Sequence, residues 1–208
     1  MYTPSSPLTA ITGMVSEIEV MSHLGRHENI VNLVGIHTKS IRKGKIYLFL
    51  ELCSLGSLTS TYAIKFQCQM RNLLLWSCEI SNAMDFLSLE KVVHADLATR
   101  NVLLTLDKRA KVSDFGLSRR LNEYDINNKS IALAIETTRE FNEKTDVWAD
   151  LPYGGISWTP DFSAQLVRGL RLEEPTFNER GMYSIMLKCW NMDPSKRPTF
   201  SQLKSSLH

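Results

Sequence analysis

The stretch from residue 94 to residue 116, HADLATRNVLLTLDKRAKVSDFG, constrains this chain more than any other. Asp96 is followed five residues later by Asn101, and eighteen residues later by Asp114 at the start of an Asp-Phe-Gly triplet. An apolar, strand-like segment, Val102–Leu104, separates the two groups. An ordinary β-hairpin is the plain alternative, but it does not explain why these two motifs stand in register.

The spacing resembles the catalytic loop and metal-binding loop of protein kinases, where H-R-D-L-x-x-x-N is followed by D-F-G. These residue types suit phosphoryl transfer, which needs a carboxylate to accept the substrate hydroxyl proton. It also needs an amide and a second carboxylate to hold Mg²⁺ against the phosphates. The resemblance implies ATP and Mg²⁺ as cofactors, Asp96 as catalytic base, and Asn101 and Asp114 as Mg²⁺ ligands. Singly, each could be a turn-stabilising side chain.

Other segments resemble receptor tyrosine kinases of the platelet-derived, vascular and fibroblast growth factor type. Ala98 and Arg100 in DLATRN resemble the D-L-A-A-R-N of tyrosine kinases. Residues 14–38 are similar to helix C and strand 4 of those kinases, and residues 189–203 to their last helices. The matches run from about residue 14 to the C-terminus.

The resemblance assigns further residues. Glu17 is implied to be the helix-C glutamate, and residues 46–53, IYLFLELC, to be strand 5 leading into the hinge. The ATP-binding residues it implies are Leu50 at the gatekeeper position, Glu51, Cys53, and Leu103 under the adenine ring. Leu103 is equally compatible with a plain core position in a strand.

Structural roles are implied for a second group of residues. His94 and Phe115 resemble members of the hydrophobic stack that joins the two lobes, and Asp146 resembles the carboxylate that supports the catalytic loop. Glu136 resembles a glutamate that pairs with an arginine, here Arg197. The remaining candidate is Tyr124, in the loop after Asp-Phe-Gly, which is either a phosphorylation site or an unmodified loop tyrosine.

Composition limits the partners. The 208 residues carry a net charge of only +2 with scattered lysines and arginines, so neither nucleic acid nor an anionic membrane surface is expected as a partner. The four cysteines lack metal-ligand spacing, and no apolar run reaches the length of a membrane span. We expect protein substrates or signalling partners, association with receptor kinases, and a cytoplasmic location. If the chain is part of a longer receptor, that location is the inner side of the plasma membrane.

The expected fold class is α+β, protein-kinase-like, with a mostly helical C-lobe and a remnant N-lobe made of helix C and a strand 4–5 hairpin. Residues 1–208 form one incomplete kinase domain, in which 14–53 are a partial N-lobe and hinge, and 54–208 a C-lobe. Helices are predicted over 14–24, 70–89, 165–170 and 182–190. Strands are predicted over 30–37, 45–52, 102–104 and 110–112.

The chain departs from the family pattern at four places. No Gly-rich loop and no V-A-I-K lysine precede Glu17, so this glutamate has no visible partner. Ala95 replaces the arginine of H-R-D. The substrate-docking segment is shortened to KSIALAIE, and most of the central C-lobe helix that should follow Trp148 is missing.

These departures set three hypotheses against each other. The chain is by family a protein tyrosine kinase that transfers the ATP γ-phosphoryl group to protein tyrosine in signal transduction. We expect ATP binding to be weak and the chain itself to be weakly active or inactive. The alternatives are a pseudokinase that serves as an interaction module, and a truncated isoform or gene model of an active receptor tyrosine kinase.

Overall fold

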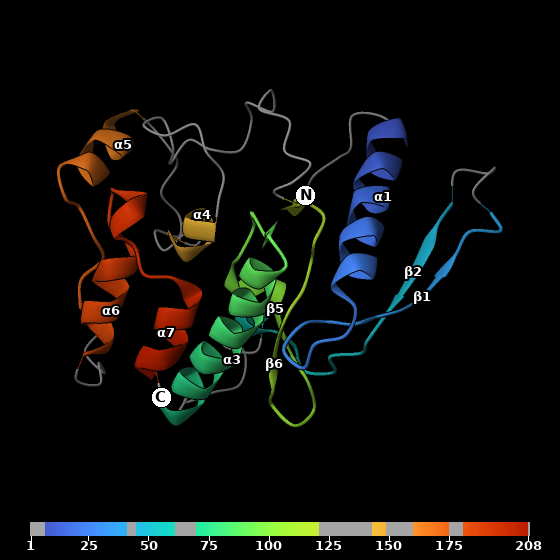
Figure 1. Ribbon diagram of the computed structural model, residues 1–208, viewed down its shortest axis with the longest axis horizontal. Helices are drawn as coiled ribbons and strands as arrows, with labels where there is room; N and C mark the ends of the chain where they lie inside the picture. Colours follow the sequence, from blue (N-terminus) through green and yellow to red (C-terminus); the bar gives the residue numbers. More distant parts are fainter. Residues whose placement is uncertain are drawn as a thin grey trace.

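The computed structural model describes residues 7–40, 45–60, 70–120, 143–148, 160–174 and 181–207. Figure 1 shows the helix α3 near the middle, with α1 and a two-stranded ribbon on one side and α5, α6 and α7 on the other. The helices are α1 (Pro7–Leu24), α3 (Met70–Leu89), α4 (Glu143–Trp148), α5 (Pro160–Val167), α6 (Met182–Cys189) and α7 (Phe200–Leu207). The strands are β1 (Leu33–His37), β2 (Tyr47–Leu50), β3 (Gly56–Ser57), β4 (Val92–Val93), β5 (Val102–Leu104), β6 (Ala110–Val112) and β7 (Arg119–Arg120).

The strands form three small antiparallel sheets, ordered β1-β2, β3-β5-β6 and β4-β7. In the β5–β6 hairpin, Val102 pairs with Val112 and Leu104 with Ala110. This register places Asn101, just before β5, beside Ser113, just after β6, and the Ser113 N–H donates to the Asn101 carbonyl at 2.8 Å. The hairpin therefore brings the two polar motifs of the sequence to one end of the sheet.

The helix α3 packs against this hairpin. Its apolar residues at positions 76, 80, 83, 84 and 87 recur at helical spacing, which gives one apolar face. At the start of that face, the buried Trp76 donates from its indole nitrogen to the Lys108 carbonyl in the β5–β6 turn at 2.8 Å. The opposite end of the hairpin from the polar motifs is thus fixed to α3.

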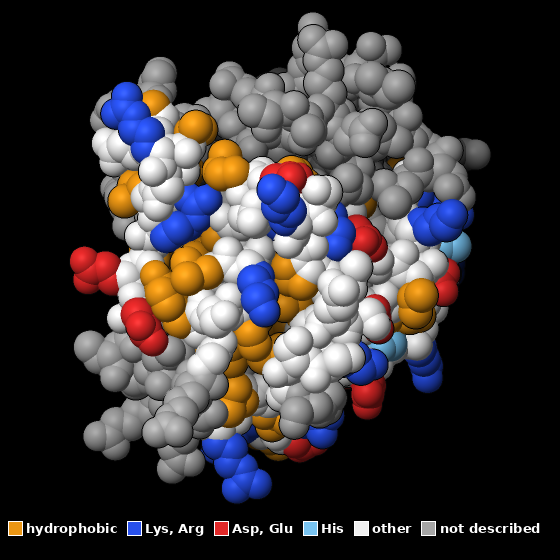
Figure 2. Space-filling model, turned by 60° about the vertical axis from the view of Figure 1, so that its left-hand side comes forward, with side chains coloured by type: hydrophobic (Ala, Val, Ile, Leu, Met, Phe, Trp, Pro, Cys, Tyr) orange, Lys and Arg blue, Asp and Glu red, His pale blue; other side chains and the backbone are white. Residues whose placement is uncertain are grey.

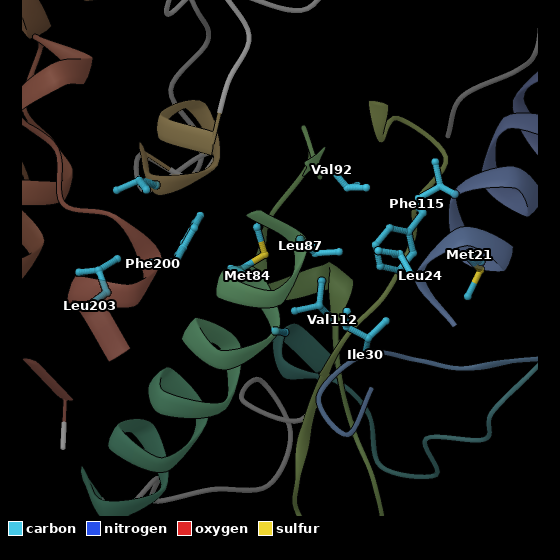
Figure 3. Packing of buried hydrophobic residues seen from close by; sticks show 13 residues of the cluster. Met21, Leu24, Ile30, Met84, Leu87, Val92, Val112, Phe115, Phe200 and Leu203 are labelled. Carbon is cyan, nitrogen blue, oxygen red and sulfur yellow. The ribbon is translucent and has the colours of Figure 1, made fainter. Parts of the chain in front are cut away.

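One core cluster joins elements from both sides of the molecule. Figure 3 shows Met84 and Leu87 of α3 between Phe200 and Leu203 of α7 on one side and Met21, Leu24 and Phe115 on the other. Because α1 and the Asp-Phe-Gly segment contribute to the same cluster as α3 and α7, the position of α1 is coupled to that of the polar motifs.

Several predicted elements are confirmed. The helix 70–89 and the strands 102–104 and 110–112 have the predicted bounds, and the mixture of helices and small sheets is the predicted α+β class. The helix α1 begins seven residues earlier than predicted, with Pro7 at a first-turn position where a missing N–H costs nothing.

The predicted helix 165–170 is wrong in its second half. The helix α5 ends at Val167, and Gly169 follows with a φ of +101°, a left-handed conformation that glycine adopts freely at helix ends. The strands 30–37 and 45–52 are likewise shorter than predicted. Residues 149–159, where the central helix was expected to be missing, lie outside the described residues.

The face drawn in Figure 2 shows no concentrated patch of positive charge among the described residues. On the face in Figure 2, lysine and arginine side chains are spread among polar and apolar ones rather than gathered in one place. Among the described helices, none combines the length and apolar character needed to cross a bilayer.

Candidate active site

Asp96 lies in the loop between β4 and the short helical turn Thr99–Asn101. Asn101 Nδ2 donates to the Asp96 carboxylate at 2.7 Å and to the Asp96 backbone carbonyl at 2.8 Å. Arg100 forms an ion pair with the other carboxylate oxygen. Arg100 and Asn101 together fix the orientation of the Asp96 carboxylate. The Asp96 side chain is 17% exposed, so a hydroxyl group can approach it.

Asn101 and Asp114 offer oxygen atoms to a cation. Because both bonds of Asn101 Nδ2 go to Asp96, the amide is oriented and its Oδ1 stays available for another partner. Asp114 is exposed after β6, and Gly116 N–H donates to its Oδ1 at 3.3 Å. One amide oxygen and one carboxylate suit Mg²⁺, which binds few protein ligands and keeps water and phosphate oxygens. Within the described ranges, no group of three or more His, Cys, Asp or Glu side chains forms a denser metal site.

Asp146 supports the loop that carries Asp96. This buried carboxylate, on α4, accepts hydrogen bonds from the backbone N–H groups of His94 at 2.7 Å and Ala95 at 2.8 Å. Ala95 has a φ of +66°, a left-handed conformation that costs a non-glycine residue about 1 kcal/mol or more. Burial raises the Asp146 pKa to about 7, and the two N–H donors offset part of that effect. The predicted supporting residue therefore contacts the loop directly.

His94 and Phe115 pack against each other in the core. Both are fully buried, and their rings lie 5.2 Å apart between centroids. The Asp96 N–H donates to His94 Nδ1 at 3.3 Å, and Nε2 lies 3.0 Å from the Ser113 carbonyl. This assigns a neutral ring with its proton on Nε2, and burial lowers the His94 pKa accordingly.

Glu17, on α1, faces the Asp-Phe-Gly segment. Burial raises the pKa of Glu17, the negative charge of Asp114 raises it further, and the backbone N–H of Phe115 lowers it in part. Phe115 packs in the same cluster as Val20 and Met21, one turn along α1. The structure thus brings Glu17 near Asp114. In the described part of the chain, the charged side chain that shifts the pKa of Glu17 is this carboxylate, not a lysine.

The predicted ATP-binding residues lie on β2, on the segment after it and on β5. Leu50 ends β2, and Glu51 and Cys53 begin the turn that follows. The Leu55 N–H donates to the Leu104 carbonyl at 3.1 Å, which brings this turn against β5 and its central residue, Leu103. Cys53 is buried, and burial raises the pKa of its thiol, with the Glu51 carboxylate adding to the rise.

Glu51 has two partners that the sequence did not predict, Lys111 and Asn32. Lys111 Nζ lies 2.9 Å from Glu51 Oε1, and Asn32 Nδ2 donates to Oε2 at 2.6 Å. Burial acts to raise the Glu51 pKa, but the hydrogen bonds from Lys111 and Asn32 outweigh it, so the pKa is lowered. A lysine between two apolar residues of a buried strand was the available signal, because a buried ammonium group requires a partner.

Arg197 is buried and ties α4 to the segment before α7. Its guanidinium donates to the Lys144 carbonyl at 2.7 Å and to the Asn191 carbonyl at 2.8 Å, and Lys144 Nζ donates back to the Arg197 carbonyl at 2.9 Å. Burial lowers the pKa of Arg197. Its predicted partner Glu136, and the predicted phosphorylation site Tyr124, lie outside the described residues.

The comparison with known families agrees with this geometry. Residues 3–207 match the family described as protein tyrosine and serine/threonine kinase. The chain belongs to the protein kinase family. Members of this family act on protein substrates and use ATP and Mg²⁺. The side-chain oxygen atoms of Asn101 and Asp114 are of the kind that Mg²⁺ binds.

Two of the proteins that this chain is similar to are fibroblast growth factor receptors. The chain is 34% identical over 225 residues to a fibroblast growth factor receptor of Hydra vulgaris, covering 93% of this chain and 27% of the relative. It is 32% identical over 234 residues to fibroblast growth factor receptor 1 of Xenopus laevis, covering 95% of this chain and 28% of the relative. The chain therefore spans about a quarter of the length of these relatives.

The predicted resemblance to receptor-type kinases is confirmed by these matches. Both matched lengths exceed the 208 residues of the kinase itself, so the relatives hold residues in this region that the chain lacks.

Proposed function

We propose that this chain catalyses transfer of the γ-phosphoryl group of ATP to a tyrosine hydroxyl of a protein, in signal transduction. The single observation that carries the proposal is the pair of hydrogen bonds from the Asn101 amide to Asp96. One amide group holds the carboxylate of Asp96 and leaves its own oxygen available to a cation.

Each residue has one task in this proposal. Asp96 accepts the proton of the substrate tyrosine hydroxyl. The tyrosine oxygen bonds to the γ-phosphorus of ATP, and the bond between that phosphorus and the β-phosphate oxygen breaks. Asn101 and Asp114 hold Mg²⁺, which neutralises charge on the phosphate oxygens. Leu50, Glu51, Cys53 and Leu103 surround the adenine ring. Asp146 and His94 keep the Asp96 loop in place.

We expect slow transfer by the 208-residue chain. Glu17 is the residue expected to bind a lysine that grips the α- and β-phosphates. In the described part of the chain its electrostatic neighbours are the Asp114 carboxylate and the Phe115 N–H. With the phosphates held from one side only, positioning is weaker, and a loss of positioning lowers the rate of phosphoryl transfer.

The wider setting is also proposed. The similarity to fibroblast growth factor receptors favours a cytoplasmic site of action at the inner side of the plasma membrane, with receptor kinases as associates. Residues 14–53 serve as a partial N-lobe and hinge, and residues 54–208 as a C-lobe. Tyr124 is the candidate phosphorylation site, and Glu136 the candidate partner of Arg197.

The test is phosphorylation of a glutamate–tyrosine copolymer by the purified chain with Mg²⁺ and radiolabelled ATP. Transfer that the Asp96→Asn and Asp114→Asn variants both lose supports the proposal, and Lys39→Glu, an exposed substitution in the β1–β2 connection, is the control. Binding of Mg²⁺-ATP without transfer, or with equal transfer by all variants, rejects catalysis. In that case an interaction module remains.

A further inference from the structure

The strand β2 has an edge that no other strand covers in the described residues, where its one partner is β1. The Glu51 N–H donates to the Asn32 carbonyl at 2.9 Å, on the β1 side. Backbone groups alternate in direction along a strand, so Tyr47 and Phe49 also face β1. The backbone N–H and C=O groups of Ile46, Leu48 and Leu50 therefore point outward, ready to pair.

The side chains along this edge are apolar and accessible. Tyr47 is 50% exposed and Phe49 is 56% exposed. Both lie on one face of the ribbon, where Tyr47 meets the ring of His37 edge-on with 5.9 Å between the centroids. A two-stranded ribbon is only marginally stable by itself, so adding strands to this edge stabilises it.

The residue order along β2 is complementary to itself. Residues 45–51 read KIYLFLE, with Lys45 at one end and Glu51 at the other. If two copies run antiparallel with Leu48 opposite Leu48, then Tyr47 faces Phe49 of the other copy and Lys45 faces Glu51. The same pairs repeat on both sides of the centre, as two-fold symmetry requires.

We propose that β2 pairs with β2 of a second copy of this chain, antiparallel and centred on Leu48, to form a four-stranded sheet ordered β1-β2-β2-β1. Leu48 with Leu48, and Ile46 with Leu50, exchange backbone hydrogen bonds. Tyr47 with Phe49, and Lys45 with Glu51, fall at the non-hydrogen-bonded positions, where side chains approach most closely.

Charge selects this occupant over an unrelated strand. In the register centred on Leu48, a second copy places Glu51 opposite Lys45 and Lys45 opposite Glu51. Any shift of the register separates both of these pairs at once. Glu51 is already bonded to Lys111 and Asn32, and its side chain keeps 29% exposure, so Lys45 of the other copy can still reach it.

The first experiment is sedimentation equilibrium of the whole chain over a range of concentrations. A monomer–dimer equilibrium is expected, weakened roughly tenfold or more by Lys45→Glu, which sets like charges opposite each other at two symmetric positions. Lys39→Glu makes the same change in net charge at another exposed lysine and should leave the equilibrium unchanged. A chain that stays monomeric, or that responds equally to both variants, overturns the proposal.

The second experiment tests the register by oxidation. In a hydrogen-bonded pair the Cα atoms are about 5.5 Å apart, within the range that a disulfide spans. The Leu48→Cys variant should form a covalent dimer, and peptide mapping should find position 48 joined to position 48. The Ile46→Cys variant places its two thiols roughly 13 Å apart along the strands and should not cross-link through position 46. Equal cross-linking at both positions, or none at either, rejects the proposed pairing.

Discussion

The carboxylate of Asp146 holds the backbone of Ala95 in a left-handed conformation, through a hydrogen bond of 2.8 Å from the Ala95 N–H. The two residues lie 51 positions apart in the chain. The strain next to Asp96 is therefore balanced by a group from a distant helix, and the loop geometry depends on α4.

Substitution of Ala95 tests that strain. Ala95→Val should destabilise the chain by about 1–3 kcal/mol, because a β-branched residue is strongly disfavoured at this positive φ. Ala95→Gly should change stability by less than about 1 kcal/mol, since glycine adopts the conformation freely but gains entropy in the unfolded chain. Urea denaturation measures both. Equal losses for the two variants would show that the site is not strained.

The raised pKa of Asp146 predicts a pH dependence of stability. Its folded-state pKa of about 7 lies above the ordinary value of 3.8, so the folded state holds a proton that the unfolded state has released. Between about pH 4 and pH 7 this group makes stability fall as pH rises, by at most about 1.4 kcal/mol per pH unit. Comparing unfolding of the parent and Asp146→Asn at pH 5, 6 and 7 isolates the contribution. Parallel pH profiles would contradict it.

The contact between Lys111 and Glu51 predicts an asymmetric pair of variants. The Lys111 side chain is 9% exposed and that of Glu51 29%. Glu51→Gln leaves a buried ammonium group without its counter-ion and should cost about 2–4 kcal/mol. Lys111→Met leaves a better-solvated carboxylate that still accepts from Asn32, and should cost about 1 kcal/mol. Thermal denaturation ranks the two, and the reverse order would disprove the burial argument.

Asn101 is expected to link stability with metal binding. Asn101→Ala removes both hydrogen bonds to Asp96 and should destabilise the chain by about 1–2 kcal/mol. It also removes the oxygen atom that we propose as a Mg²⁺ ligand, so Mg²⁺-dependent nucleotide affinity should fall about tenfold or more. Titration calorimetry with Mg²⁺-ATP, with a metal-free titration as control, separates the two effects. Unchanged affinity would remove Asn101 from the metal site.

Glu17 gives the opposite expectation. Its pKa is raised by burial and by Asp114, so ionising Glu17 costs more free energy in the folded state than in the unfolded chain. Glu17→Gln should therefore leave nucleotide affinity unchanged and raise stability slightly at pH 7, with the gain vanishing as pH falls toward the ordinary pKa of 4.5. A clear loss of affinity would reveal a cationic partner of Glu17.

The sequence predicts the short-range parts of this site well. Asp96 and Asn101 are five residues apart on one loop, and the hairpin of β5 and β6 carries Asp114 back to them. Patterns of that kind are local, so residue spacing alone is informative. The family resemblance then supplies the roles of Glu17 and Asp146, which lie on other elements.

Long-range polar contacts are harder to predict. Asn32, Glu51 and Lys111 come from three segments, and nothing in their spacing indicates that they meet. The end of α5 was also missed, because the preference of Gly169 for a left-handed conformation outweighs the apolar periodicity that continues to Leu170.

The hydrogen bonds of His94 have a consequence for chemical modification. Both ring nitrogens are engaged, Nδ1 with the Asp96 N–H and Nε2 with the Ser113 carbonyl, and the ring is fully buried. The nitrogen of a neutral imidazole is a nucleophile toward acylating reagents. His94 can react with such a reagent only after the surrounding segment has opened. The rate of that reaction would measure how often the Asp96 loop detaches from the core, independently of any substrate.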